Sequence, residues 1–181
     1  DDLEGCSRGP DPTSDKLTEL VSKTKNIGFA FDLDSDRVIL VMNGEKKSSD
    51  ITLGLGVVKA IKLGIKKFVL SLDSSLAIEK FIIKNGGKVW RSKVGEANVI
   101  QIMIENDAEA GGEGSSGGFV LRKFNMCRDG LLTSGLIASM IDDESIQKDI
   151  EFFESFSQIR EKISIESKFH ERVIERLTKK L

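Results

Sequence analysis

Residues 27–41 read Ile27-Gly28-Phe29-Ala30-Phe31-Asp32-Leu33-Asp34-Ser35-Asp36-Arg37-Val38-Ile39-Leu40-Val41. Asp32, Asp34 and Asp36 alternate between two apolar runs that we expect to form buried strands. Carboxylates that converge on one point repel one another, so this acidic loop (residues 32–37) is unfavourable unless a hard divalent cation with oxygen ligands lies there. Arg37 follows directly, and a guanidinium beside a metal favours a site that handles a phosphate.

The composition is that of an ordinary globular chain. Of its 181 residues, 39% are hydrophobic and 31% are charged, and the net charge is −2. This balance gives no electrostatic reason to expect binding to nucleic acid or to an anionic membrane. No apolar run approaches the roughly 18 residues that suggest a membrane span. Cys6 and Cys127 match no zinc or redox spacing, so we expect a cytoplasmic setting.

Hydrophobic periodicity indicates an α/β fold. Asn43-Gly44 predicts a hairpin turn after the second strand that flanks the acidic loop. From Ser49 onward, apolar helices alternate with short strands, which favours a layered fold with a largely parallel or mixed sheet. The expected helices cover residues 16–25, 51–63, 75–84, 94–106, 129–141, 144–156 and 167–181. The expected strands cover residues 27–31, 38–42, 67–72, 88–92, 108–112, 118–124 and 158–165.

A second informative stretch is Gly111-Gly112-Glu113-Gly114-Ser115-Ser116-Gly117-Gly118, which we call the glycine loop. Its composition alone is typical of a flexible linker. In a tight turn between two strands, however, Glu113 can accept hydrogen bonds from two vicinal hydroxyls, and Ser115 adds a donor and an acceptor. We expect the glycines to let a sugar approach the backbone.

One alternative reading starts from the same aspartates. Phe31-Asp32-Leu33-Asp34 resembles the strand end of haloacid-dehalogenase-like phosphatases, in which the first carboxylate, here Asp32, is the nucleophile. Ser71 and the pair Asp142-Asp143 could supply further parts of such a site. Against this reading, Asp36 stands where that family has threonine or valine, and Asp142-Asp143 closes a helix rather than a strand.

Taken together, the acidic loop and the glycine loop resemble the α-D-phosphohexomutase family, which comprises phosphoglucomutase, phosphomannomutase and phosphoglucosamine mutase. Three further segments match motifs of the family in the same order along the chain: Arg8-Gly9-Pro10-Asp11-Pro12, Ser92-Lys93-Val94-Gly95 and Arg128-Asp129-Gly130-Leu131-Leu132. The resemblance covers nearly the whole chain.

The resemblance implies a piece of a four-domain enzyme. Residues 1–48 would be the C-terminal part of domain 2 with its metal-binding loop, and residues 49–143 a three-layer, mixed-sheet domain 3 with the sugar-binding loop. Residues 144–181 would be a linker and the start of domain 4. The chain begins with Asp1-Asp2 and no methionine, so we expect a longer parent protein. The phosphoserine loop and the phosphate clamp of the family have no counterpart here, and the only histidine is His170.

Carried over residue by residue, the acidic loop matches the magnesium site of the family. Asp32, Asp34 and Asp36 match the three Mg²⁺ ligands, and Arg37 matches the catalytic arginine that faces the reacting phosphate. Leu33 departs from the family, which usually has glycine at this position.

The substrate-binding positions of the family lie in the remaining loops. Glu113 and Ser115 match the pair that holds the sugar hydroxyls. Lys93 and Arg128 lie in loops that would contact the substrate.

The implied activity is phosphoryl transfer between an enzyme serine and the 1- or 6-position of a hexose phosphate, through a 1,6-bisphosphate. The expected partners are the hexose phosphate and the missing domains of the same protein, with no nucleic acid and no membrane. We expect this chain alone to be inactive, because the phosphoserine and the phosphate clamp are absent. A non-catalytic fragment that binds sugar phosphates remains a further alternative.

Overall fold

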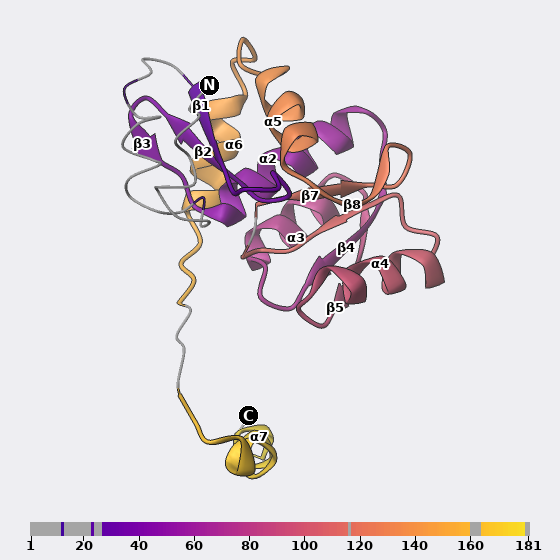
Figure 1. Ribbon diagram of the computed structural model, residues 1–181. Helices are drawn as coiled ribbons and strands as arrows, with labels where there is room; N and C mark the ends of the chain where they lie inside the picture. The colour runs from indigo at the N-terminus through magenta and orange to yellow at the C-terminus, as the bar shows by residue number, and fades with distance from the viewer. Residues whose placement is uncertain (1–11, 13–22, 24–26, 116, 160–163, 180–181) are drawn as a thin grey trace.

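Two β-sheets and the helices packed against them form the body of the chain (Figure 1). The computed structural model describes residues 12, 23, 27–115, 117–159 and 164–179. Among these residues, no helix is both long enough and apolar enough to cross a membrane.

The larger sheet consists of five strands: β4 (Lys67–Ser71), β5 (Lys88–Ser92), β6 (Ala110–Gly112), β7 (Phe119–Leu121) and β8 (Asn125–Asp129). Their order in space is β5-β4-β6-β7-β8. β4 pairs in parallel with β5 and β6, whereas β7 pairs antiparallel with both β6 and β8. The expected mixed sheet is therefore confirmed.

Helices cover both faces of this sheet: α2 (Ser49–Lys62), α3 (Leu76–Lys84) and α4 (Glu96–Glu105). Successive residues of a strand point to opposite faces. Phe68 and Leu70 of β4 accordingly join the core that contains α2 and α3, and Val69 packs with Met103 of α4 in a second core. This arrangement confirms the three-layer α/β fold.

The smaller sheet carries the acidic loop. It contains β1 (Ile27–Phe31), β2 (Val38–Met42) and β3 (Glu45–Lys46), all antiparallel. Phe31 pairs with Val38, so residues 32–37 form the connection between β1 and β2, as predicted. Asn43 and Gly44 have φ values of 53° and 79°, which suit the expected hairpin turn.

One buried hydrogen bond joins this hairpin to α2, a helix that covers the larger sheet. The Leu40 N–H of β2 donates to Thr52 Oγ1 of α2 at 3.1 Å. Leu40 itself is fully buried in the core that also contains α2, so β2, the strand that follows the acidic loop, is held against this helix.

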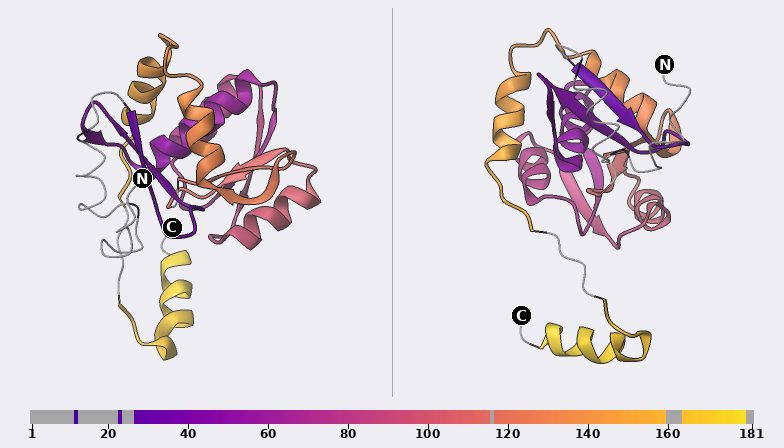
Figure 2. Two further views of the ribbon diagram at one scale, coloured as in Figure 1. Left: turned by 45° about the horizontal axis from the view of Figure 1, so that its top comes forward. Right: turned by 60° about the vertical axis from the view of Figure 1, so that its left-hand side comes forward.

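The remaining helices follow β8: α5 (Gly130–Ala138), α6 (Ile146–Glu154), the 3₁₀ turn η2 (Ser167–Phe169) and α7 (His170–Thr178). Asp129 caps α5, because its Oδ1 accepts a hydrogen bond from Leu132 N at 2.7 Å. α6 packs on α2, where Gly54 leaves room for the ring of Phe153. α7 lies apart from the body of the chain (Figure 2).

The strands differ from the sequence expectations in two ways. Residues 45–46 form β3 and residues 125–129 form β8, two strands that we did not predict. The strand expected at residues 158–165 is wrong at each of its described positions, which have irregular structure. The expected helix at residues 16–25 and the Arg8-to-Pro12 motif lie, but for the isolated residues 12 and 23, outside the described residues.

Candidate functional site

The three aspartates of the acidic loop converge. One carboxylate oxygen from each of Asp32, Asp34 and Asp36 lies within 4.8 Å of the other two. Ser35 has a φ of 60°, in the left-handed region, which reverses the backbone and brings Asp36 back toward Asp32. Asp32 is buried, Asp36 is half-buried and Asp34 is exposed.

Arg37 closes the loop onto Asp32. The backbone N–H of Arg37 donates to Asp32 Oδ1 at 3.1 Å, and Nε donates to Asp32 Oδ2 at 2.5 Å. The same Nε lies 3.7 Å from Asp36 Oδ1. Burial raises the pKa of the Asp32 carboxyl, but the hydrogen bonds from Arg37 outweigh burial and hold this pKa below its ordinary value.

Asp36 shows the opposite shift. Burial and the neighbouring Asp32 carboxyl raise the pKa of Asp36, despite the attraction of Arg128. Among the described contacts, the three carboxylates share two guanidinium groups, those of Arg37 and Arg128. Converging oxygen donors with excess negative charge are what a hard divalent cation such as Mg²⁺ requires, so these residues fit that ion.

Glu113 of the glycine loop is held from two sides. It is only 3% exposed. Its Oε1 accepts a hydrogen bond from Gly95 N at 2.5 Å, and its Oε2 lies 2.7 Å from Nη1 of Arg128. Ser115 is exposed in the same loop.

The glycines of this loop have a packing role that the sequence did not indicate. A Cβ atom at Gly117 or Gly118 would overlap the carbonyl oxygen of Val38 or Asp36, and one at Gly112 would overlap the side chain of Leu53. That the glycines let a sugar approach the backbone stays a prediction. Gly117 and Gly118 also allow the glycine loop to pack directly against the backbone of the acidic loop and the start of β2.

Arg128, at the end of β8, connects the loops. Its Nη2 lies 2.5 Å from Asp36 Oδ2, and its Nη1 lies 2.7 Å from Glu113 Oε2. Its backbone N–H and its Nε both donate to Glu96 Oε2, at 2.8 and 3.0 Å. Burial lowers the pKa of Arg128, but the three carboxylates outweigh burial and raise it. Arg128 therefore joins the acidic loop, the glycine loop and Glu96 in one network of ion pairs.

Sequence reasoning did not identify Glu96. Its only signal was its place directly after the Ser92-to-Gly95 motif, at the first residue of α4, where an acidic side chain is favourable for any helix. Lys93, in the same motif, has an exposed side chain. The motif reaches the network through Gly95 and Glu96 rather than through Lys93.

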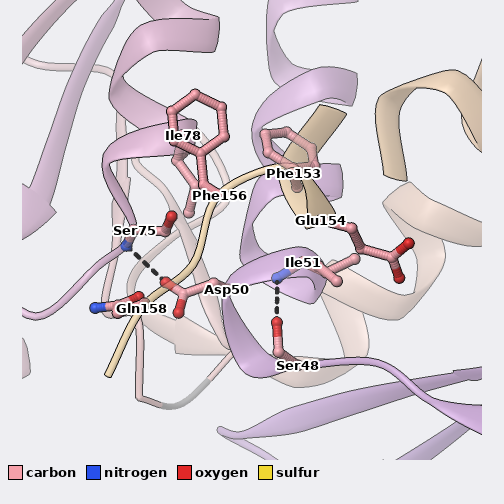
Figure 3. A pocket seen from close by; sticks show the side chains of 9 residues that line it. All are labelled: Ser48, Asp50, Ile51, Ser75, Ile78, Phe153, Glu154, Phe156 and Gln158. Carbon is pink, nitrogen blue, oxygen red and sulfur yellow. Dashed lines mark hydrogen bonds between the residues drawn. The ribbon is translucent and has the colours of Figure 1, made fainter. Parts of the chain in front are cut away.

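A pocket of about 280 Å³ lies elsewhere, where the N-termini of α2 and α3 meet the segment after α6 (Figure 3). Two of its polar groups accept hydrogen bonds at helix N-termini: Asp50 Oδ1 from Ser75 N at 2.8 Å, and Ser48 Oγ from Ile51 N at 3.2 Å. The lining contains none of the residues of the ionic network, and consists of Ser48, Asp50, Ile51, Ser75, Ile78, Phe153, Glu154, Phe156 and Gln158.

Ser71 and Asp143, which the alternative phosphatase site would use, have partners outside the acidic loop. Ser71 ends β4, and its hydroxyl donates to Asp73 and accepts a hydrogen bond from Gly114 N. Asp143 pairs with Lys62 at the end of α2 rather than with any residue of the acidic loop. The described contacts therefore give Asp32 no second acidic pair from this segment.

The family described as phosphoglucomutase/phosphomannomutase, alpha/beta/alpha domain III, matches residues 49–157. The chain belongs to this phosphohexomutase family.

Individual relatives agree. A phosphoglucosamine mutase of Nautilia profundicola is 34% identical over a region that covers 79% of this chain and 34% of that protein. One of Dictyoglomus turgidum is 31% identical and covers 90% of this chain and 37% of that protein. A phosphoglucomutase/phosphomannomutase family protein of Burkholderia thailandensis has the same fold, with a TM-score of 0.67 and 23% identity over 80% of this chain and 33% of that one. The chain thus spans about a third of the length of these relatives.

Proposed function

We propose that this chain carries the magnesium-binding and sugar-binding loops of a phosphohexomutase that interconverts hexose 1-phosphates and 6-phosphates. The observation that supports this most strongly is the guanidinium of Arg128, which contacts Asp36 at 2.5 Å and Glu113 at 2.7 Å. A cation held by the first carboxylate and a sugar held by the second would be neighbours in one site.

In this proposal, Asp32, Asp34 and Asp36 hold Mg²⁺. When bound, Mg²⁺ withdraws charge from the oxygens of a phosphoserine that another part of the longer protein supplies. Arg37 is the catalytic residue of this chain. Its side chain is 37% exposed, so it can reach the transferring phosphoryl group and stabilise the charge on its equatorial oxygens.

Glu113 and Ser115 bind the sugar hydroxyls. They hold similar hydroxyls in both orientations of the substrate, which supplies positioning rather than chemistry. Lys93, exposed near the Gly95 contact, would pair with a substrate phosphate. Arg128 keeps Glu113 oriented toward the sugar.

The reaction itself is two phosphoryl transfers. The phosphoserine gives its phosphoryl group to the free 1- or 6-oxygen of a hexose monophosphate, which forms the 1,6-bisphosphate and a free serine. The bisphosphate then turns over and returns its other phosphoryl group to the serine. The partners in this proposal are the hexose phosphate and the remaining domains, in the cytoplasm, with no nucleic acid and no membrane.

The proposal is tested by comparing this chain with the longer protein that contains it. Glucosamine phosphate is the first substrate to try, because the curated relatives above are named phosphoglucosamine mutases. In a coupled assay, the longer protein is expected to isomerise it, and the 181 residues alone are not. Sustained turnover by the chain alone would contradict the role given to the missing domains. Binding without turnover by the longer protein would favour a non-catalytic sugar-phosphate-binding protein.

Glu113→Ala in the longer protein is expected to raise KM by about 10- to 100-fold, with kcat changed by less than about threefold, since it removes hydrogen bonds to a charged group that serve positioning. Glu144→Ala, which truncates an exposed glutamate outside the network, is the matched control. A fall in kcat at unchanged KM would refute the positioning role of Glu113.

A further inference from the structure

Arg128 and a cation in the acidic loop need the same carboxylate. Nη2 of Arg128 lies 2.5 Å from Asp36 Oδ2, and Asp36 is one of the three residues whose oxygens converge in that loop. A divalent cation that binds these oxygens therefore draws on negative charge that Arg128 already uses. Binding of the cation must weaken the Asp36–Arg128 pair.

The other terminal nitrogen of the Arg128 guanidinium group contacts the glycine loop. Nη1 of Arg128 lies 2.7 Å from Glu113 Oε2, and Glu113 is only 3% exposed. The Arg128 side chain itself is 21% exposed, so water screens this network only partly. When Asp36 binds a cation, the guanidinium group of Arg128 still pairs with Glu113 and Glu96.

Glu96 keeps Arg128 in place while its partners change. A single oxygen, Oε2, accepts hydrogen bonds from both the backbone N–H and the Nε of Arg128, at 2.8 and 3.0 Å. The two bonds hold the main chain of Arg128 and the Nε of its guanidinium group, which leaves the two terminal nitrogens to Asp36 and Glu113. Arg128 can change its electrostatic partner without leaving its position.

We propose that Arg128 is a positioning residue that couples cation binding in the acidic loop to sugar binding at Glu113, by sharing one positive charge between Asp36 and Glu113. Glu96 is the residue that holds Arg128 in this role. The inference rests on the proposed function, because it takes the acidic loop as the cation site. By thermodynamic reciprocity, whatever engages Glu113 must also change the affinity of the acidic loop for its cation.

The test is titration of this chain with Mn²⁺ alone, followed by the electron paramagnetic resonance signal of the free ion. Arg128→Met is expected to tighten Mn²⁺ binding by about five- to tenfold, because it removes a competing positive charge from Asp36. A purely structural role predicts the opposite, since a disordered loop binds the ion more weakly. Arg122→Met is the matched control: it removes the same charge from an arginine that pairs with Asp107 instead, and it should leave the affinity unchanged within twofold.

A second variant tests the coupling without removing Arg128. Glu113→Gln keeps the shape of the side chain but leaves more of the Arg128 charge for Asp36, so it is expected to weaken Mn²⁺ binding by about threefold. In the Arg128→Met background, Glu113→Gln should change the logarithm of the Mn²⁺ dissociation constant by less than half as much as it does in the wild-type background. Equal effects in both backgrounds would overturn the coupling, as would unchanged or weaker binding in Arg128→Met.

The outcomes also separate this inference from the proposed function. If the chain does not bind Mn²⁺ saturably, or if Asp34→Ala does not remove this binding, the acidic loop is not a cation site. Both proposals then fail. If such binding exists but responds to Arg128→Met no more than to Arg122→Met, only the coupling fails.

Discussion

Asp34→Ala is expected to lower kcat of the longer protein by roughly a hundredfold or more, while KM changes by less than about threefold. Asp34 is exposed in the acidic loop, so its truncation removes one of the proposed cation ligands without removing contacts of the core. The free energy of unfolding of the metal-free chain should therefore stay close to that of the wild type. Steady-state kinetics with added Mg²⁺ and urea unfolding measure the two effects separately.

Asp142→Ala provides the control and also tests the alternative phosphatase site. Asp142 is an exposed aspartate after α5, outside the network of Arg128. The mutase proposal expects full activity in this variant. Loss of activity in Asp142→Ala, together with a covalent phosphate on Asp32, would favour the haloacid-dehalogenase-like site instead.

Gly117→Ala is expected to destabilise the chain by about 3 kcal/mol, the combined cost of a left-handed alanine and of an overlap with a backbone atom. Gly117 has a φ of 69°, and an added Cβ would overlap the carbonyl oxygen of Val38. Backbone cannot move aside as a flexible side chain can, so the glycine loop must shift away from the acidic loop. Urea unfolding followed by circular dichroism measures the loss.

Gly135→Ala is the matched control for this prediction. Gly135 lies within α5, and a Cβ there would meet no atom within 4 Å. The same added methyl group should stabilise the helix by about 0.5–1 kcal/mol. A Gly117→Ala variant as stable as the wild type would show that the two loops are not packed as described.

The parts of the fold with strong local signals could be predicted from the sequence. The two apolar runs around the acidic loop pair as β1 and β2, and Asn43-Gly44 forms the turn that follows. Asp129 caps α5 because its side chain lies three residues before the N–H that it accepts from, which is a local property.

Features that depend on distant parts of the chain could not be predicted in this way. β8 contains no β-branched residue, and its extended conformation comes from pairing with β7. Glu96 and Arg128 are 32 residues apart and meet only in the folded chain. Likewise, the glycines of the glycine loop have the composition of a linker, and only the positions of the acidic loop and the start of β2 show why Gly117 and Gly118 exclude side chains.

The junction between the two loops consists largely of main-chain atoms. A Cβ at Gly118 of the glycine loop would overlap Asp36 O, and Gly130 N, at the start of α5, donates to Ser35 O of the acidic loop at 2.9 Å. Contacts between main-chain atoms cannot be relieved by a change of side-chain rotamer. We therefore expect the proposed ion-binding loop and the proposed sugar-binding loop to move together as one rigid unit. In the proposed enzyme, the space needed to flip a bisphosphate end over end has to be created by the domains that surround this unit.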